Sequence, residues 1–398
     1  MFQFTTPNKI LMGNDIVATA SGIFTSLGHH ALIVTGPNVG KSTMVATLER
    51  TLDRDGVKYT VLDEITGEPT TAMVAHGVKA YREHECDFII GLGGGSPLDA
   101  SKAIAAMTVL PGKISDYRGR NITTELPPLV CIPTTAGTGS EVTKYTIITD
   151  EESGVKMLLT GDSLLPRVAM VDYTFSNSCP PSVTAATAID ALTHAIEAFV
   201  SVQAQPLSDA LALSAIKRIM RYLPKAYRDG TDMEARRELA IAATQAGLCI
   251  NNSSVTIVHG MSRPLGATFH VPHGVSNAML LGTCLIDLEQ AARHNLARIA
   301  TYMRIHAVDE IDASEKFVAE VEKLLNKCEI PSLMEFGIDE REFEAAIVKM
   351  SHDAIDSGSP SHAPKEYTAE QIQSLYRKAY HRKTKEQEGG GFFSSLRK

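Results

Sequence analysis

Residues 87–99 read DFIIGLGGGSPLD, and this stretch decides the fold class. The β-branched run Asp87–Gly91 predicts a buried strand, and a helical pattern begins after the glycines. Ser96 is a favoured N-cap, Pro97 suits the first helical position, and Asp99 can complete a capping box. A strand that runs through a glycine loop into a helix is the local unit of a parallel α/β sheet.

The three consecutive glycines are more than a tight turn requires, because a backbone without Cβ atoms can approach a ligand closely. The free N–H groups and the positive dipole end of the following helix suit a pyrophosphate. We therefore predict a cofactor-binding loop here; a strand-to-helix turn without a ligand is the alternative. The predicted binding residues are Gly93, Gly94, Gly95, Ser96 and Asp99.

Short apolar runs alternate with helical stretches through the first half of the chain, which favours a parallel sheet flanked by helices. Further strands are predicted at Ala31–Thr35, Tyr59–Leu62 and Leu129–Pro133, helices at Lys41–Arg54 and Thr70–Glu85, and a hairpin at Thr146–Thr149 and Lys156–Thr160. The glycine loop follows the third predicted strand, and its spacing only approximates the Rossmann fingerprint. The sequence thus predicts a Rossmann-like domain that is not a standard one.

The second half contains long alanine- and leucine-rich helical stretches and no convincing strand. These stretches are Ser182–Val200, Pro206–Arg228, Asp232–Asn251 and Val275–Arg304. Pro180-Pro181 marks the joint, because consecutive prolines stop one element and Pro-Ser opens a helix. We predict an α/β domain over residues 1–179, an all-helical domain over 180–380, and a disordered polar tail over 381–398.

The composition excludes several function classes. A net charge of −8 over 398 residues argues against a nucleic-acid surface. The six cysteines are scattered without a Cys-x-x-Cys pair, which suits reduced thiols in the cytoplasm. The start MFQFTTPNKI lacks the features of a secretory signal, and no window approaches the roughly 18–20 apolar residues of a membrane span. We expect a cytoplasmic protein that acts on small molecules.

A second loop of small residues, TTAGTGSE at 134–141, follows the predicted strand Leu129–Pro133. Because α/β sheets bind ligands at the carboxyl ends of their strands, this loop is predicted to line the same cofactor. Its candidate binding residues are Thr134, Thr135, Thr138 and Ser140. The segment Gly36–Ser42 resembles a Walker A loop but has three residues between its glycines instead of four, so we reject a P-loop.

Acidic and histidine side chains in the second half suggest a metal site. Asp190 and His194 stand four residues apart in AIDALTHAIEAF, which places them on one helical face among apolar neighbours. A surface salt bridge is the alternative for that pair. Further on, His259, His270 and His273 occur with little surrounding charge. Burying these groups together is costly unless a cation satisfies them, and a carboxylate with imidazoles suits Fe²⁺ or Zn²⁺.

Four motifs together carry a family resemblance: GGGSPLDASKAIA, TTAGTGSE, AIDALTHAIEAF and VHGMSRPLGATFHVPHG. In this order they resemble the iron-containing (group III) alcohol dehydrogenases, up to about Tyr380. The resemblance implies an α/β domain that binds NAD(P)(H), a helical domain that binds the metal, and an active-site cleft between them, an architecture shared with dehydroquinate synthase. It places the metal ligands at Asp190, His194, His259 and His273, with His270 beside the site.

Two positions depart from the family pattern. Many members carry a histidine four residues after the third ligand, where this chain has Arg263. Many also have Thr-Asp after the first predicted strand, where the carboxylate contacts the adenosine ribose; this chain has Thr35-Gly36. We assign Gly36 and Asn38 to cofactor binding, and we expect both departures to tune specificity without changing the core chemistry.

The resemblance implies hydride transfer between NAD(P)(H) and a small aldehyde or primary alcohol. The candidate catalytic residues are His270 for passing a proton to solvent, Arg263 for orienting the substrate, and Tyr145 as a further donor. A guanidinium at position 263 favours an anionic substrate such as succinic semialdehyde, sulfoacetaldehyde or phosphonoacetaldehyde. The alternative is a dehydroquinate synthase-like sugar-phosphate cyclase, which needs several basic residues around a phosphate; few occur near these histidines.

A homodimer is the expected assembly. Phe2, Phe4 and Ile10 alternate with polar residues, which predicts an edge strand that can pair across a two-fold axis. The family resemblance also favours a dimer.

Overall fold

The computed structural model describes residues 2–382, so all but the first two residues of the predicted tail lie outside the described residues. The chain divides into two compact units, Thr5–Ser178 and Met1–Phe4 with Cys179–Lys398. The division therefore falls one residue before the predicted joint, and the first four residues group with the helical unit. All six cysteines are free, and only Cys179 among them is not buried.

The α/β unit is built on a parallel sheet of six strands with the order β1-β8-β5-β4-β2-β3. The strands are β1 (Lys9–Gly13), β2 (His30–Val34), β3 (Lys58–Leu62), β4 (Phe88–Gly93), β5 (Leu129–Pro133) and β8 (Val168–Asp172). A separate antiparallel hairpin joins β6 (Tyr145–Asp150) to β7 (Val155–Thr160). The predicted fold class, a parallel α/β domain followed by a helical one, is confirmed.

Two strands were missed or misplaced by the sequence prediction. The sequence pattern did not predict β8. The glycine loop follows the fourth strand of the chain, not the third, because β1 precedes the three strands counted in the sequence. The predicted amino-terminal edge strand is only partly right. Ile10 lies in β1, which is an edge strand, but Phe2 and Phe4 precede it in irregular backbone.

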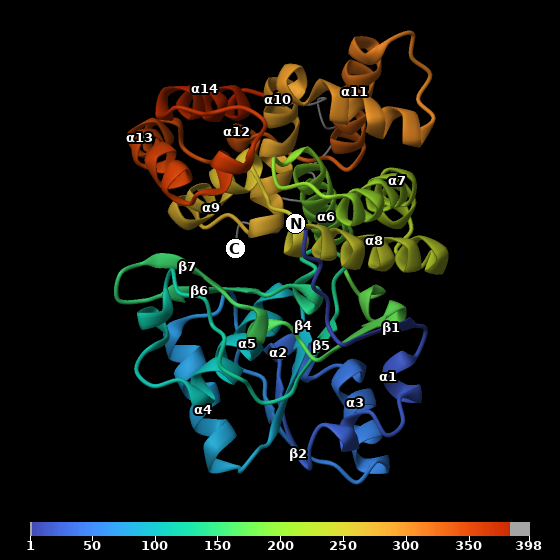
Figure 1. Cartoon of the computed structure of the whole chain (residues 1–398), viewed down its shortest axis with the longest axis vertical. Helices are drawn as coiled ribbons and strands as arrows, with labels where there is room; N and C mark the ends of the chain where they lie inside the picture. Colours follow the sequence, from blue (N-terminus) through green and yellow to red (C-terminus); the bar gives the residue numbers. More distant parts are fainter. Residues whose placement is uncertain (1, 383–398) are drawn as a thin grey trace. The chain divides into compact units, whose positions relative to one another are not determined.

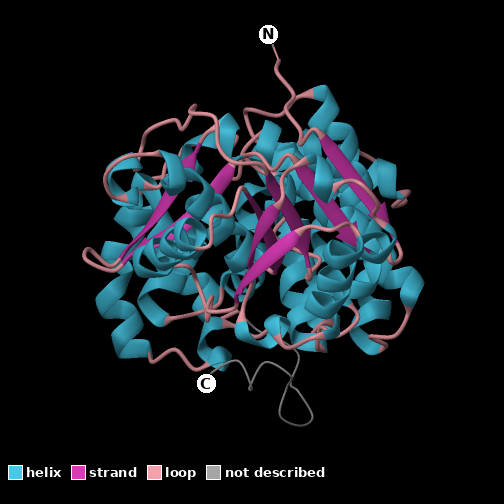
Figure 2. Ribbon diagram, turned by 90° about the horizontal axis from the view of Figure 1, so that it is seen from below, coloured by secondary structure: helices cyan, strands magenta, loops and turns pink. Residues whose placement is uncertain are grey.

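Helices cover both faces of the sheet (Figures 1 and 2). Alternate residues of a strand point to opposite faces, so Ile33 packs in a core with Leu48 of α3 (Thr43–Arg54). The next residue, Val34, packs in the other core with residues of α4 (Thr71–Glu83) and α5 (Gly95–Val109). Two short helices, α1 (Ile16–Thr19) and α2 (Pro37–Gly40), pack against α3.

This topology creates a binding position at the carboxyl ends of the central strands. The chain leaves β2 toward α3 on one face and leaves β4 toward α5 on the other. Because β2 and β4 are neighbours, their connections diverge at the edge between them, which is the position where open α/β sheets bind ligands. The glycine loop therefore lies at the switch point of the sheet.

The helical unit contains no strand within residues 179–382. Its helices are α6 (Pro181–Val200), α7 (Pro206–Arg228), α8 (Met233–Asn252), α9 (Ile257–Phe269), α10 (His273–Met303), α11 (Glu310–Lys327), α12 (Leu333–Phe336), α13 (Glu340–Asp356) and α14 (Ala369–Tyr380). The expectation that no stretch approaches a membrane span was too strong. Among the described residues, α6 is long and apolar enough to cross a membrane, but 89% of its apolar window is buried inside the unit, as in a core helix.

Candidate active site

Four side chains from three helices converge in the helical unit. Asp190 and His194 lie on α6, His259 on α9, and His273 is the first residue of α10. One potential ligand atom from each lies within 4.8 Å of all the others. Asp190 Oδ1 is 3.6 Å from His259 Nε2 and 3.8 Å from the Nε2 atoms of His194 and His273. These are the four residues that the family resemblance indicated.

The burial of this cluster sets its charge states. Asp190, His194 and His259 are at most 4% exposed, whereas the side chain of His273 is 32% exposed and opens the cluster on one side. Burial by itself would raise the pKa of Asp190, but the neighbouring histidines lower it below its ordinary value. Burial lowers the pKa of His194 to about 4. Near neutral pH the cluster therefore presents an ionised carboxylate and a neutral imidazole, the states in which these groups bind a cation.

A buried glutamate that the sequence analysis did not select lies behind His259. Glu197 Oε2 is 2.5 Å from His259 Nδ1, and Glu197 Oε1 accepts hydrogen bonds from Thr256 Oγ1 and the Val258 amide, both at 2.7 Å. Its position three residues after His194 and seven after Asp190 puts Glu197 on the same face of α6. That spacing in an alanine-rich helix was the available signal.

Polar atoms in the cluster fit a cation. The amide Nδ2 of Asn277 donates to Asp190 Oδ1 at 2.6 Å and lies 3.1 Å from His259 Nε2. Within the described part of the chain, the buried atoms His194 Nδ1 and Asn277 Oδ1 have no hydrogen-bond partner. Burying one carboxylate and three imidazoles together costs free energy, and a divalent cation among Asp190 Oδ1 and the three Nε2 atoms offsets that cost.

Arg263 lies one turn after His259 on α9, and its Nη1 donates to Ser359 Oγ at 2.9 Å. Burial is the main cause of the low pKa of His194; the Asp190 carboxylate opposes it, and the Arg263 guanidinium adds a smaller lowering effect. His270 is different: it is an exposed residue in left-handed backbone (φ 54°) at the end of α9, and it is not part of the four-residue group.

The two predicted cofactor loops lie side by side in the α/β unit. Gly93 ends β4, and its carbonyl accepts a hydrogen bond from the Thr134 amide at 2.9 Å, immediately after β5. An ideal Cβ on Gly94 would lie 3.6 Å from Thr135, and one on Gly95 would lie 2.9 Å from Thr138. The structure therefore brings the glycine loop and the threonine loop together, as the parallel sheet predicts.

The predicted helix start is wrong in detail. The N-cap of α5 is Gly94, and Ser96 and Pro97 already lie inside the helix. Asp99 forms no capping box: its Oδ1 accepts from Ser140 Oγ at 2.6 Å, and its Oδ2 accepts from the Ile147 amide at 2.9 Å. Gly94 holds the capping position in extended backbone. The first amides of α5 have no intrahelical acceptor, as at the start of every α-helix, and can therefore bind a ligand.

A buried lysine, which the sequence analysis missed, holds these loops in place. Lys102 is fully buried on α5, and its Nζ donates to Ser140 Oγ at 2.9 Å and to the carbonyls of Thr143 and Tyr145, both at 2.8 Å. Together with Asp99, this network fixes the threonine loop and the start of β6 on α5. Tyr145 was predicted to be a catalytic donor; the bond to Lys102 uses its backbone carbonyl.

The three glycines serve different purposes. A Cβ on Gly93 would meet Pro97 Cγ at 2.6 Å, and Gly93 adopts a φ of 155°, so the fold itself requires glycine there. Gly94 is different, because its Cβ would make only an ordinary contact with Thr135. The lack of a side chain at Gly94 therefore leaves open space at the start of α5 that protein packing does not require.

Gly36 and Asn38 lie at the carboxyl end of β2, in the turn that forms α2. A Cβ on Gly36 would be 2.8 Å from the Ile65 carbonyl oxygen. The close approach of the loop after β3 is thus a packing reason for glycine at this position, in addition to any effect on the cofactor.

With this geometry established, comparisons with known proteins assign the family. Residues 7–173 match the family described as iron-containing alcohol dehydrogenase, and residues 184–380 match the family described as Fe-containing alcohol dehydrogenase, C-terminal. The chain is 36% identical over 354 residues to alcohol dehydrogenase 4 of Saccharomyces cerevisiae, covering 88% of this chain and 91% of the relative. The chain belongs to the iron-containing alcohol dehydrogenase family.

Solved structures of this family have the same architecture. The structure of a 1,3-propanediol oxidoreductase aligns with a TM-score of 0.92 and 33% identity, over 95% of this chain and 100% of the other. A sulfoacetaldehyde reductase from Bifidobacterium kashiwanohense in complex with NAD⁺ aligns with a TM-score of 0.85 and 26% identity, over 96% and 100%. As a member of the iron-containing alcohol dehydrogenases, the chain is a metal-dependent oxidoreductase. These comparisons favour an alcohol dehydrogenase over the sugar-phosphate cyclase alternative.

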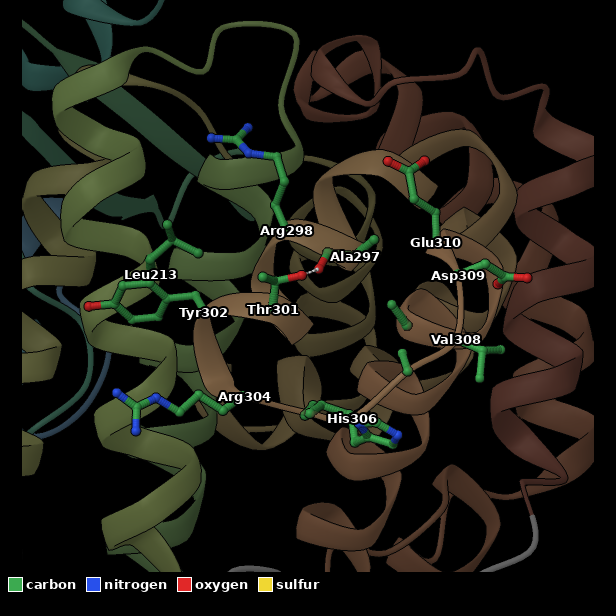
Figure 3. A pocket seen from close by; sticks show the side chains of 13 residues that line it. Leu213, Ala297, Arg298, Thr301, Tyr302, Arg304, His306, Val308, Asp309 and Glu310 are labelled. Carbon is green, nitrogen blue, oxygen red and sulfur yellow. Dashed lines mark hydrogen bonds between the residues drawn. The ribbon is translucent and has the colours of Figure 1, made fainter.

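A further hollow of about 870 Å³ lies in the helical unit of this alcohol dehydrogenase (Figure 3). It is formed by Leu213 of α7, the carboxyl-terminal part of α10, the segment after it and the start of α11. None of the 13 residues that line it belongs to the metal cluster or to the cofactor loops.

Proposed function

We propose that this chain transfers a hydride between NAD(P)(H) and a small aldehyde or primary alcohol, with one Fe²⁺ or Zn²⁺ held by Asp190, His194, His259 and His273. The observation that carries the proposal is the convergence of one carboxylate oxygen and three imidazole nitrogens within 4.8 Å. When bound, the cation supplies Lewis acidity to the substrate oxygen.

The residues of this chain perform the remaining tasks. Asp190 is held ionised, which provides the negative charge that a cation site needs. Gly94 lets a pyrophosphate approach the first amides of α5, and Lys102 holds the threonine loop beside them. His270, exposed at the end of α9, is proposed to exchange a proton with solvent, and Tyr145 to supply a further donor. The test is turnover followed by nicotinamide absorbance, since a cyclase produces no stoichiometric change in that band.

The cofactor proposal includes tolerance of NADPH. A carboxylate at position 36 would repel a 2′-phosphate, and Gly36 has none. Because a side chain at this position would collide with the Ile65 carbonyl, the ratio of kcat/KM for NADH and NADPH is best measured on the unaltered chain.

We expect Gly94→Val to raise the KM for the nicotinamide cofactor about tenfold or more. The physical reason is that a Cβ at position 94 makes only an ordinary contact with Thr135, whereas the side chain occupies the space through which a pyrophosphate would reach the amides of α5. Gly94→Ala should have a smaller effect of the same kind.

Gly95→Ala is the matched control for this prediction. Its Cβ would press on Thr138 Cγ2 at 2.9 Å, so we expect it to lower the melting temperature. An unchanged cofactor KM in Gly94→Val would show that the glycine loop does not bind the cofactor.

We also propose that the chain forms a homodimer through the edge strand β1, whose outer side has no neighbouring strand among residues 2–382. Light scattering at micromolar concentration tests this, and a mass near that of the monomer, 42.9 kDa, would refute it.

A further inference from the structure

We propose that Glu197 is a positioning residue that fixes the tautomer of His259, so that Nε2 of this imidazole keeps its lone pair for a cation. The inference rests on the proposed metal site. Glu197 is not one of the four candidate metal ligands. Among those four residues, its hydrogen bond is to His259.

The hydrogen bonds around Glu197 determine where the proton on His259 sits. Both Glu197 oxygens are occupied, Oε1 by the Thr256 hydroxyl and the Val258 amide, and Oε2 by His259 Nδ1 at 2.5 Å. An ionised carboxylate can only accept hydrogen bonds, so Nδ1 must carry the proton. In the neutral ring Nε2 is then unprotonated, and it is Nε2 that points to Asp190 at 3.6 Å.

The surroundings hold Glu197 in place. Its side chain is 2% exposed, and its two oxygens take part in three hydrogen bonds. The Asn277 amide Nδ2, which can only donate, lies 3.1 Å from His259 Nε2, so this nitrogen is the acceptor and Nδ1 carries the proton. Thr256 is the N-cap residue of α9 and Val258 is its second helical residue, so the same carboxylate anchors the start of the helix that carries His259.

The competing interpretation is that Glu197 only stabilises α9. The two interpretations differ for Glu197→Gln, which keeps the size of the side chain and an oxygen for Thr256 and Val258. The glutamine NH₂ would donate to Nδ1, which forces the His259 proton onto Nε2 and removes the lone pair that faces Asp190. A positioning role therefore predicts a loss of metal affinity, while a purely stabilising role predicts no specific loss.

The experiment measures Zn²⁺ affinity of the full chain, without cofactor, by competition with a chromogenic chelator, and the melting temperature of the metal-free proteins. We expect Glu197→Gln to weaken Zn²⁺ binding roughly tenfold to a hundredfold. Thr256→Val is the matched control, because it removes one hydrogen bond to Glu197 and leaves the bond to His259 in place. We expect its Zn²⁺ affinity to stay within about threefold of the unaltered chain, inside the usual scatter of such contributions.

Glu197→Asp provides a second comparison if the glutamine variant does not fold. Because its shorter carboxylate cannot reach His259 Nδ1 as well, the Glu197→Asp protein should bind Zn²⁺ less tightly than the Thr256→Val protein. The two proteins should have similar melting temperatures. Equal Zn²⁺ affinities for the unaltered chain and the folded Glu197 variants would overturn the positioning role while leaving the metal site intact. Failure of the unaltered chain to bind Zn²⁺ would instead overturn the proposed metal site itself.

Discussion

Removal of the metal by extensive chelation is expected to lower turnover about a thousandfold or more, and Fe²⁺ or Zn²⁺ should restore it. A Lewis acid supplies several kcal/mol of transition-state stabilisation, and each ~1.4 kcal/mol corresponds to a factor of ten in rate. His259→Ala should lose turnover to a similar extent and should not recover when metal is added, because the substitution deletes the imidazole that lies 3.6 Å from Asp190. The measurements are metal content and kcat on the same samples.

His294→Ala is the matched control for the histidine substitution. This histidine lies on α10, the helix that begins with His273, but it is exposed and pairs with Glu310 on the surface. The variant should keep both metal content and turnover. Full activity in a demonstrably metal-free sample would refute the metal hypothesis. Zinc can dominate recombinant protein whatever the native ion, because zinc ranks above iron in intrinsic affinity.

The central part of the fold was predictable because its signals are local. The strands β2, β4 and β5 are short β-branched runs bounded by glycine or proline, and all are buried on both faces, as the sequence pattern indicated. The edge strand β1 carries a weaker signal, since Lys9 is exposed and its other residues are only partly buried. Tertiary pairing with β8, not local preference, determines that β1 is a strand.

The metal cluster and the cofactor loops were predictable to different degrees. The i, i+4 spacing of Asp190 and His194 predicted their shared helix face, whereas the choice of His259 and His273 over His270 came from the family resemblance. The hydrogen bond between Asp99 and Ser140 could not be predicted from local spacing, because the two residues are 41 positions apart in the sequence. Whether a polar side chain faces a ligand or another side chain depends on such long-range contacts.

Residues that support the site without facing it are the hardest to predict. Lys102 looks like an ordinary helix-surface lysine in the sequence, yet it is fully buried and donates to the carbonyls of Thr143 and Tyr145. Glu197 likewise reads as a charged residue on an amphipathic helix. Apart from the spacing of Glu197 on α6, the role of each becomes clear once the packing shows that burying a charge requires the partners found around it.

The second large effect is expected from Arg263→Met, which should lower kcat/KM for an aldehyde with a terminal anionic group by roughly tenfold to a hundredfold. This range follows from the ~1.5–3 kcal/mol of a hydrogen bond to a charged group, at ~1.4 kcal/mol per factor of ten. We propose that Arg263 binds the anionic end of a short substrate, such as succinic semialdehyde, sulfoacetaldehyde or phosphonoacetaldehyde. The proposal is supported by the position of Arg263 one turn after His259 on α9.

The similar proteins differ in the substrates that their names give, so the charge of the substrate is the property to vary. One relative is named for sulfoacetaldehyde and another for 1,3-propanediol, which is neutral. The experiment compares kcat/KM for matched charged and neutral aldehydes of equal length in the unaltered chain, in Arg263→Met and in Ser359→Ala. Ser359→Ala removes the hydroxyl that Arg263 Nη1 contacts at 2.9 Å but leaves the guanidinium in place, so it should lose only part of the preference. If propanal and lactaldehyde are used as well as the charged aldehydes by both the unaltered chain and Arg263→Met, the anion pocket does not exist.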